Sequence, residues 1–207
     1  MEDTESLAWK NTEIEDLWIF DKLILSKKLG YICGPVGVDV PVPGNYIVRP
    51  CVNIPGMGRG AEVKFIEKDT YNMTPGHFWC ELFNGRHISV DYKNGNQALA
   101  VEGLRYKDKN ELWRFSMWKK LDENIPLPSI FYSLTKKYEY VNIEFIDGNP
   151  IEVHLRNNPD FEYNNTIAIP VWNDQKDPEL DVTGLRYVMD PCYHRKGFWI
   201  DWGGRNA

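Results

Sequence analysis

The stretch NIEFIDGNPIEVHLR, residues 142–156, carries the clearest fold signal in the sequence. Two alternating apolar and polar runs flank Asp147-Gly148, a dipeptide that is typical of hairpin turns because glycine tolerates positive φ. We predict a three-residue loop, 147–149, because this register places Glu144 opposite Glu152 and keeps the apolar side chains of both strands on one face. A two-residue loop would set each glutamate opposite an apolar residue.

The predicted hairpin brings two carboxylates together. Directly opposed residues have Cβ atoms roughly 5 Å apart, and like charges at that spacing are destabilising. The arrangement is stable if a cation lies between Glu144 and Glu152 or if one carboxyl keeps its proton. Mg²⁺ is a hard cation that takes one or two carboxylates together with substrate phosphates. The alternative is a solvated polar face whose charges, His154 and Arg156 included, are loosely held.

Length and composition limit the classes of protein to consider. The 207 residues favour one domain, and 43% hydrophobic with 14% aromatic residues support a sizeable core. The net charge of −6 argues against a nucleic-acid-binding surface. The four cysteines (Cys33, Cys51, Cys80 and Cys192) are far apart in sequence, which favours reduced thiols in a cytoplasmic protein. No apolar run is long enough for a membrane helix, and no signal peptide is recognisable.

Strands outnumber helices in the expected order of elements, which predicts an α+β fold with mainly antiparallel sheet. In chain order we expect a frayed segment 1–12, a helix 13–29 ended by Gly30, a connector 31–45, a strand 46–50, a glycine-rich loop and strand 53–66, strands 77–83 and 87–92 joined by a turn at Asn84-Gly85, a turn 93–96, a strand 97–106, a segment 109–120 that fits strand or helix, a helix 126–138, the hairpin, and an irregular tail 159–207.

The loop NIPGMGRGAEV, residues 53–63, has the composition of a phosphate-binding loop, because glycines let backbone N–H groups approach an anion. It is not a Walker A loop, since no Gly-Lys-Ser/Thr follows, and glycine loops are often only turns. Arg49 precedes the loop on a strand and could contact phosphates, with a surface salt bridge as the alternative.

The order and spacing of these segments resemble the ATP-grasp superfamily, most of all the ATP-binding domain of the biotin carboxylase and carbamoyl-phosphate synthetase branch. The resemblance runs from about residue 20 to residue 156. Its segments are FDKLILSKKLGYICGPV, YIVRPCVNIPGMGRGAEV, CELFNGRHISVDY, KKLDENIP and IEFIDGNPIEVHLR.

The resemblance implies a single domain, 1–207, that holds a nucleotide between two small subdomains. Residues 46–83 would form the glycine-flap part, 84–158 the central sheet with the metal hairpin, and 159–207 a divergent tail that could supply an acceptor site. The implied cofactors are ATP and Mg²⁺. The implied roles are nucleotide contact for Lys22, Arg49, Gly56, Gly58, Gly60, Glu81, Leu82, Phe83 and His87, metal binding for Glu144, Glu152 and His154, and catalysis for Lys120 and Arg156.

Three departures from the family pattern affect this interpretation. His154 stands where the family has Asn, and because imidazole suits transition metals better than Mg²⁺, Mn²⁺ is a second candidate. Arg49 stands where Lys is usual, which replaces a point charge with a planar fork. Only about 20 residues precede the match, where the family usually has a further domain. We therefore expect the acceptor site to come from the tail, from a second copy or from a partner protein.

The family reaction implies an ATP-dependent ligase that phosphorylates a small-molecule or peptide carboxylate and joins it to an amine or thiol. The alternatives are a non-catalytic nucleotide-binding or scaffold protein and a small-molecule phosphotransferase. The aromatic and basic end of the tail, 193–207, fits an anionic or planar acceptor site, a nucleic-acid surface or a segment packed on the sheet. We expect neither a nucleic-acid nor a membrane partner.

Overall fold

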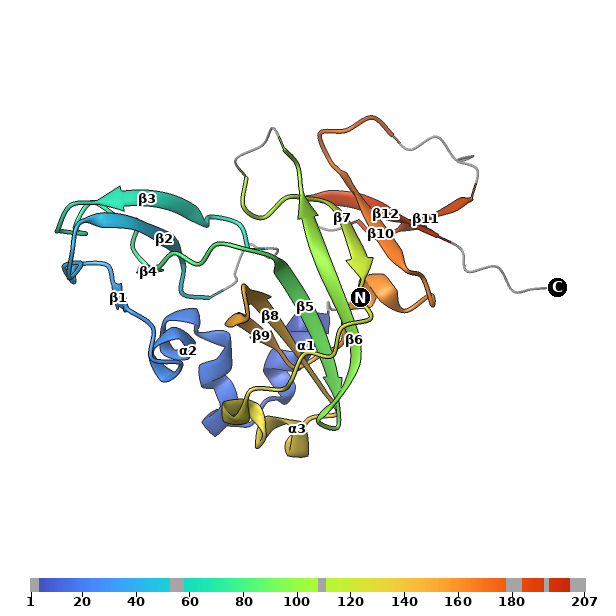
Figure 1. Ribbon diagram of the computed structural model, residues 1–207, viewed down its shortest axis with the longest axis horizontal. Helices are drawn as coiled ribbons and strands as arrows, with labels where there is room; N and C mark the ends of the chain where they lie inside the picture. The colour runs from blue at the N-terminus through green and yellow to red at the C-terminus, as the bar shows by residue number, and fades with distance from the viewer. Residues whose placement is uncertain (1–3, 53–57, 108–110, 178–183, 192–193, 202–207) are drawn as a thin grey trace.

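The structure is a computed structural model that describes residues 4–52, 58–107, 111–177, 184–191 and 194–201. It contains two antiparallel sheets and a few short helices, so the predicted α+β class is confirmed (Figure 1). The smaller sheet has the strand order β1-β4-β2-β3, and the larger has the order β11-β12-β10-β7-β6-β5-β8-β9. Within the described residues, no helix has the length and apolar character needed to cross a membrane.

The elements in chain order are α1 (Thr4–Asn11), the 3-10 helix η1 (Ile14–Phe20), α2 (Lys22–Lys28), β1 (Cys33–Pro35), β2 (Gly44–Pro50), β3 (Glu62–Ile66), β4 (His77–Glu81), β5 (His87–Lys93), β6 (Asn96–Arg105), β7 (Phe115–Lys120), η2 (Ser129–Phe131), α3 (Leu134–Lys137), β8 (Tyr140–Ile146), β9 (Asn149–His154), η3 (Pro159–Phe161), β10 (Ile167–Trp172), β11 (Leu185–Met189) and β12 (Arg195–Asp201).

The hairpin of β8 and β9 has a different turn from the predicted one. Ile146 pairs with Asn149, so the loop has two residues, Asp147 (φ 50°) and Gly148 (φ 79°). Two-residue turns with positive φ at both positions are favoured because their twist matches the right-handed twist of the strands. A β-bulge beside Glu144 then shifts the register, and Glu144 pairs with Glu152 as predicted. The three-residue loop was therefore wrong, because a bulge supplies the extra residue within the strand.

The predicted helix 13–29 is also wrong as one element, because it is interrupted at Asp21. This residue has an extended backbone (φ −90°, ψ 103°), and its carboxylate accepts hydrogen bonds from the backbone N–H groups of Leu23 and Ile24. Aspartate is a strong helix N-cap, so it starts α2 afresh after η1. The end predicted at Gly30 is confirmed, with φ 80°. The helix predicted over 126–138 is reduced to η2 and α3.

Four further expectations are corrected, resolved or confirmed. Strands β4 and β5 do not form a hairpin at Asn84-Gly85, because they belong to different sheets and the segment links the two. The ambiguous stretch 109–120 yields strand β7, and the tail contributes β10, β11 and β12 to the larger sheet. The turn predicted at 93–96 is confirmed, since Lys93 pairs with Asn96.

The larger sheet has one apolar and one polar face around β5, β8 and β9. Val90, Ile143 and Val153 lie on the apolar face and pack in one buried cluster with Leu25 of α2 and Leu134 of α3. Because successive side chains of a strand alternate between faces, the residues between them point the other way. The opposite face carries the polar side chains of the opening stretch, and the helices hold the apolar face in place behind them.

The smaller sheet is organised in the same way. Tyr46, Val48 and Trp79 form its buried core on one face. Arg49 and Cys80 come from alternate positions and lie on the other face. The charges of Glu152 and Glu144 act on Arg49, so this second face is directed toward the polar face of the larger sheet.

Candidate functional site

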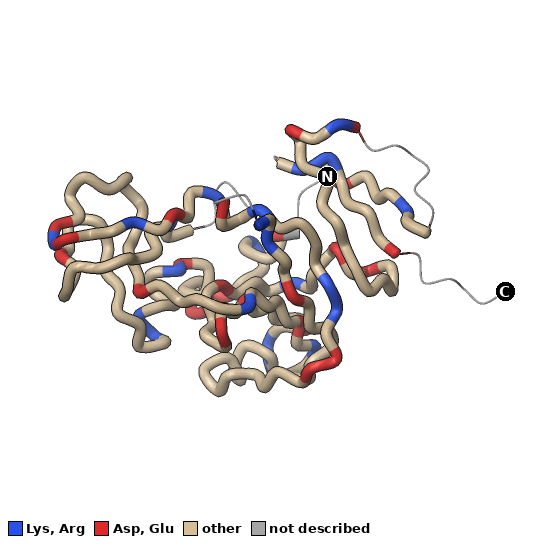
Figure 2. Tube along the Cα trace, turned by 45° about the horizontal axis from the view of Figure 1, so that its top comes forward, with Lys and Arg blue, Asp and Glu red and all other residues tan. Residues whose placement is uncertain are grey.

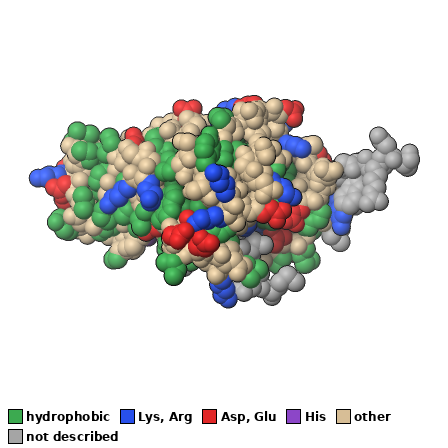
Figure 3. All heavy atoms as spheres, turned by 90° about the horizontal axis from the view of Figure 1, so that it is seen from below, with side chains coloured by type: hydrophobic (Ala, Val, Ile, Leu, Met, Phe, Trp, Pro, Cys, Tyr) green, Lys and Arg blue, Asp and Glu red, His purple; other side chains and the backbone are tan. Residues whose placement is uncertain are grey.

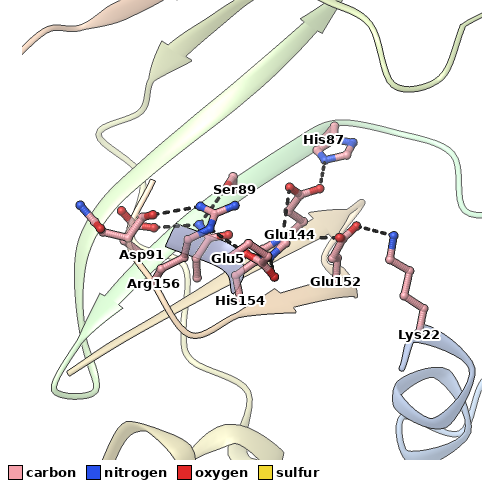
Figure 4. A network of polar contacts seen from close by, with 11 residues as sticks. Glu5, Lys22, His87, Ser89, Asp91, Glu144, Glu152, His154 and Arg156 are labelled. Atoms are coloured by element: carbon pink, nitrogen blue, oxygen red, sulfur yellow. Dashed lines mark hydrogen bonds and ion pairs between the residues drawn. The ribbon is translucent and has the colours of Figure 1, made fainter. Parts of the chain in front are cut away.

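The polar side chains on β5, β8 and β9 form one buried group (Figure 4). Glu152 and Glu144 are cross-strand partners, and Ser89 is the next partner in the same row. The Glu152 and His154 residues are only 7% and 5% exposed. The solvated polar face considered from the sequence is therefore wrong for this hairpin, and buried charges must be paired to be stable.

Each of the two facing carboxylates has a basic partner. Lys22 Nζ lies 3.0 Å from Glu152 Oε2, and the two side chains are 4% and 9% exposed. His87 donates from Nε2 to Glu144 Oε2 at 3.0 Å. Burial raises the pKa of Glu144, but the hydrogen bond and charge of His87 lower it more, so the carboxylate is held ionised. The repulsion expected between the two glutamates is thus offset by side chains of the protein.

His154 lies between the two carboxylates at the position where the sequence suggested a cation. Its Nε2 atom is 3.5 Å from Glu152 Oε1 and 4.0 Å from Glu144 Oε1. Its Nδ1 atom is 2.9 Å from Glu5 Oε1. Burial lowers the pKa of His154, but the negative charge of Glu5 and its hydrogen bond raise this pKa by more. The net shift is therefore upward and favours the imidazolium.

Glu5 is the site residue that the sequence analysis missed. It lies on α1, within the segment 1–12 that was expected to be frayed, and it also accepts a hydrogen bond from Arg156 Nε at 2.7 Å. Burial raises the pKa of Glu5, yet His154 and Arg156 together bring it down to about 2. No short-range sequence pattern links residues separated by some 150 positions, so the sequence holds no signal for this contact.

Arg49 differs from the other basic residues of this group. Arg49 is 7% exposed, and its guanidinium carbon lies over the Phe78 ring, 5.3 Å from the ring centroid. Among the described residues, the Nε atom has no hydrogen-bond partner. Burial lowers the pKa of Arg49, and the negative charges of Glu152 and Glu144 oppose this shift. Buried donors are almost always paired, so this guanidinium is suited to an anionic ligand.

The glycine-rich loop leads from Arg49 into β3, which pairs with β2 as an antiparallel hairpin. Gly58 and Gly60 have positive φ values of 67° and 82°. A Cβ atom on Gly60 would lie 3.2 Å from Pro50, so Gly60 lies close to the end of β2. The predicted contact at Gly56 lies outside the described residues.

The predicted nucleotide-contact segment Glu81–Phe83 forms the link between the two sheets. The Glu81 carboxylate accepts from the Ile32 backbone N–H at 2.8 Å, and the Glu81 N–H donates to the Ile32 carbonyl at 2.8 Å. Phe83 packs edge-on against Tyr31, with centroids 4.7 Å apart. Leu82 lies between them and is partly buried. In this structure the segment fastens β1 to β4, and its contact with a nucleotide stays a prediction.

The two predicted catalytic residues are not adjacent to each other. Arg156 is in the buried group through Glu5. Lys120 is exposed at the end of β7, three strands from Glu144 in the row through Ser89 and Val101. Strand spacing puts it roughly 14 Å from Glu144. Lys120 lines a separate hollow, which is shared by Asp91, Tyr140 and Asn165 among others.

The donor set can be compared with the needs of a metal ion. Glu144 and Glu152 offer the carboxylate oxygens that Mg²⁺ prefers, whereas a protonated His154 has no lone pair to offer. The only group of three acidic, histidine or cysteine ligands close enough to share a metal in the described parts of the chain is Glu13, Glu15 and Asp16, which surround Lys137. Glu144, Glu152 and His154 are not such a group in the described parts of the chain, so their role as metal ligands stays a prediction, and His154 could join them only after it loses a proton.

No protein-family model matches the sequence, and no curated protein matches it either. Solved structures with a similar course of the chain include an ATP-grasp superfamily protein from Archaeoglobus fulgidus (15% identity, TM-score 0.49), an L-amino acid ligase from Bacillus licheniformis (13%, 0.39) and a D-alanine–D-alanine ligase from Bacillus anthracis complexed with ATP (14%, 0.36). The alignments cover 88%, 67% and 67% of this chain and 64%, 40% and 54% of those chains.

The superfamily named for the first of these structures is the one that the sequence resembles. The chain spans less than two thirds of the length of each of the three. At these identities the similarity concerns the course of the chain, and the particular branch predicted from the sequence stays a prediction.

Proposed function

We propose that the chain binds ATP between its two sheets and uses it to join a carboxylate to an amine or a thiol. The observation that carries the proposal is Arg49, a buried guanidinium whose Nε has no partner among the described residues, on the face directed toward Glu144 and Glu152. A buried cation opposite two carboxylates, the ligand type that Mg²⁺ prefers, is suited to a phosphate chain carrying a divalent metal.

Each part of the site has a role in this proposal. Arg49 would contact the phosphates by charge-assisted hydrogen bonds. The backbone N–H groups of the turn at Gly58 and Gly60 would donate further hydrogen bonds to the phosphates. Glu144 and Glu152 would hold Mg²⁺, or Mn²⁺ if His154 joins them. The metal would neutralise charge on the phosphates. Lys22 and His87 are predicted from the sequence as nucleotide contacts. Because the ion pair of Lys22 and the hydrogen bond of His87 engage the two carboxylates, we propose that they position these carboxylates instead.

The proposed reaction has two steps. An oxygen of the substrate carboxylate attacks the γ-phosphorus of ATP, the bond to the bridging oxygen breaks, and ADP leaves while an acyl phosphate forms. The amine or thiol then attacks the acyl carbon, and inorganic phosphate leaves as the new bond forms. The proposed substrate is a small-molecule or peptide carboxylate, and Arg156 would stabilise its acyl phosphate. Lys120 is roughly 14 Å from Glu144, so it would contact a part of the substrate away from the reacting carboxylate, in the hollow beside β7.

A second function is favoured by one specific observation. The His154 imidazole lies between the two carboxylates and its pKa is raised, so the protein can balance their charge without a metal. This arrangement favours a protein that binds a nucleotide and has no ligase activity. Its nucleotide-bound form would then be recognised by a partner protein or by a second copy of the chain. In the view of Figure 2 acidic and basic residues are intermixed over the described trace, and no continuous basic stripe is seen that would support a nucleic-acid partner.

The experiment measures ADP and inorganic phosphate release from ATP with Mg²⁺ or Mn²⁺, with pools of amino acids and short peptides as acceptors. The ligase proposal expects phosphate release that depends on the acceptor, a condensed product by mass spectrometry, and loss of both in Arg49→Met. The matched control is Arg86→Met, because Arg86 is exposed and pairs with Glu102. ATP binding without turnover would support the second function, and a stable phosphorylated product would indicate a phosphotransferase.

A further inference from the structure

Cys33 and Cys80 face each other on neighbouring strands of the smaller sheet. They are register partners in the antiparallel pair of β1 and β4. The ladder hydrogen bonds are made by their neighbours, from Glu81 N to the Ile32 carbonyl and from Val36 N to the His77 carbonyl. Because hydrogen-bonded and non-hydrogen-bonded pairs alternate along an antiparallel ladder, Cys33 and Cys80 form a non-hydrogen-bonded pair.

This type of pair brings two side chains as close as a sheet allows. Directly opposed residues point to the same face, and in non-hydrogen-bonded pairs the Cα atoms are about 4.5 Å apart. Disulfides occur at Cα separations of about 4.4–6.8 Å. Both cysteines are free thiols in this structure, and both are close enough to Arg49 for its charge to act on them. The backbone therefore needs no large movement to accommodate a bridge.

We propose that Cys33 and Cys80 are a modification site, at which a small-molecule disulfide of the glutathione class converts the two thiols into a reversible cross-strand disulfide. The sequence analysis expected isolated reduced cysteines because no two of them share a short spacing. The pairing of β1 with β4 brings together two residues from distant parts of the chain. The proposal is independent of ATP binding, since it depends only on the strand register.

The exposure of the two residues gives the order of the steps. Cys33 is partly exposed, whereas Cys80 is 1% exposed. The Cys33 thiolate attacks one sulfur of oxidised glutathione, which releases one glutathione thiolate and leaves a mixed disulfide on Cys33. The Cys80 thiolate then attacks the Cys33 sulfur and releases the second glutathione thiolate. The two protein protons end on the two glutathiones, so the sum is one disulfide exchanged for another.

The surroundings of the pair indicate how the exchange depends on pH. Burial raises the pKa of Cys33, and burial raises the pKa of Cys80 to about 12, although the charge of Arg49 and a hydrogen bond from Ser26 lower it in part. Because the thiolate is the nucleophile, the exchange becomes faster as pH rises. The bridge would fasten β1, which follows α2 and its Lys22, to β4 and the Glu81 link.

In the test, the folded wild-type chain is incubated with oxidised glutathione at pH 8.5. The remaining thiols are then alkylated under denaturing conditions, and peptide mapping identifies which cysteines were oxidised. The expected result is loss of two of the four thiols, a Cys33–Cys80 peptide pair, and recovery of both thiols with dithiothreitol. Cys51→Ser is the matched control and should give the same bridge. Cys33→Ser and Cys80→Ser should each prevent it.

Three outcomes would overturn the proposal. The first is a glutathione adduct that persists on Cys33 while Cys80 stays reduced. The second is a bridge that involves Cys51 or Cys192 in place of this pair. The third is retention of all four thiols in the folded wild-type chain. Peptide mapping of the wild type decides between these outcomes even if a serine variant fails to fold.

Discussion

Lys22 and Glu152 form a buried ion pair, 3.0 Å between Nζ and Oε2, that joins the first turn of α2 to β9. The pair combines a structural contact between helix and sheet with one of the two carboxylates of the candidate site. Changing either residue therefore alters the fold as well as the site. Tests of ATP binding are better placed on Arg49, whose charge is not tied to one carboxylate by a hydrogen bond.

Removing one member of the Lys22–Glu152 pair should be costly. Lys22→Met leaves a buried carboxylate without its main partner and should lower the free energy of unfolding by about 3–5 kcal/mol. The double variant Lys22→Met/Glu152→Leu should recover a large part of that loss. Urea unfolding monitored by tryptophan fluorescence measures both. Arg86→Met, in a solvent-exposed cluster with Glu102 and Glu123, should cost clearly less than Lys22→Met, because solvent screens exposed ion pairs. Equal losses in the buried and exposed variants would contradict the assignment.

Arg49→Met should have the opposite effect on stability. It removes a buried charge whose Nε has no partner, so the free energy of unfolding should stay unchanged or rise by about 1 kcal/mol. Arg195 is the matched control, because it is equally buried and its Nε also has no partner, but its two terminal nitrogens bind Asp160 at 2.6 and 2.7 Å. Arg195→Met should cost about 3–5 kcal/mol. A comparable loss in Arg49→Met would mean that Arg49 is a structural residue and would weaken the phosphate assignment.

Stability should depend on pH through Glu5 and His154. The pKa of Glu5 falls from 4.5 to about 2 on folding, so its contribution is complete above pH 4.5 and is lost as pH falls toward 2. The pKa of His154 is raised from 6.5, so its contribution is complete below pH 6.5 and is lost as pH rises through the folded value. Both contributions overlap between about pH 4.5 and 6.5.

Urea unfolding midpoints measured from pH 2 to 9 test this dependence. Glu5→Gln should flatten both the acidic and the alkaline limb, because it removes the titrating carboxylate and the partner of His154. Glu139→Gln is the control, since Glu139 is an exposed partner of Lys93. A pH profile of Glu5→Gln that differs from wild type only by a constant offset would show that the pair does not titrate with folding.

The Asp147-Gly148 turn provides a test of the corrected hairpin. Gly148 has φ 79°, and a Cβ atom placed there would meet nothing within 4 Å. Gly148→Ala should therefore cost about 1–2 kcal/mol through backbone strain alone. Gly148→Asn should cost less, because asparagine tolerates this conformation. Equal costs for the two variants would indicate that the turn changes conformation.

The sequence was sufficient for the parts of the fold that depend on local pattern. The strands at 46–50, 87–92 and 97–106 and the turn at 93–96 follow from alternation and turn residues, as does the pairing of Glu144 with Glu152. The bulge beside Glu144 could not be predicted, because it leaves the alternation of apolar and polar residues in β8 intact. It only adds one unpaired residue to β9.

Tertiary contacts account for what the sequence could not supply. Glu5 reaches His154 and Arg156 from the start of the chain, and Cys33 meets Cys80 across a strand pair. Burial of the polar face depends on these distant elements. The surface gives little further guidance, because hydrophobic, acidic and basic side chains are intermixed over the face shown in Figure 3.

The most direct test of the central claim is a thermal-shift titration with ATP and a non-hydrolysable analogue, each with Mg²⁺ or Mn²⁺, on wild type, Arg49→Met and Arg86→Met. A ligand that binds only the folded chain raises the unfolding midpoint with its concentration. The proposed site predicts a metal-dependent rise in wild type and Arg86→Met and a much smaller rise in Arg49→Met. No rise in wild type with any nucleotide, or an equal rise in Arg49→Met, would contradict it.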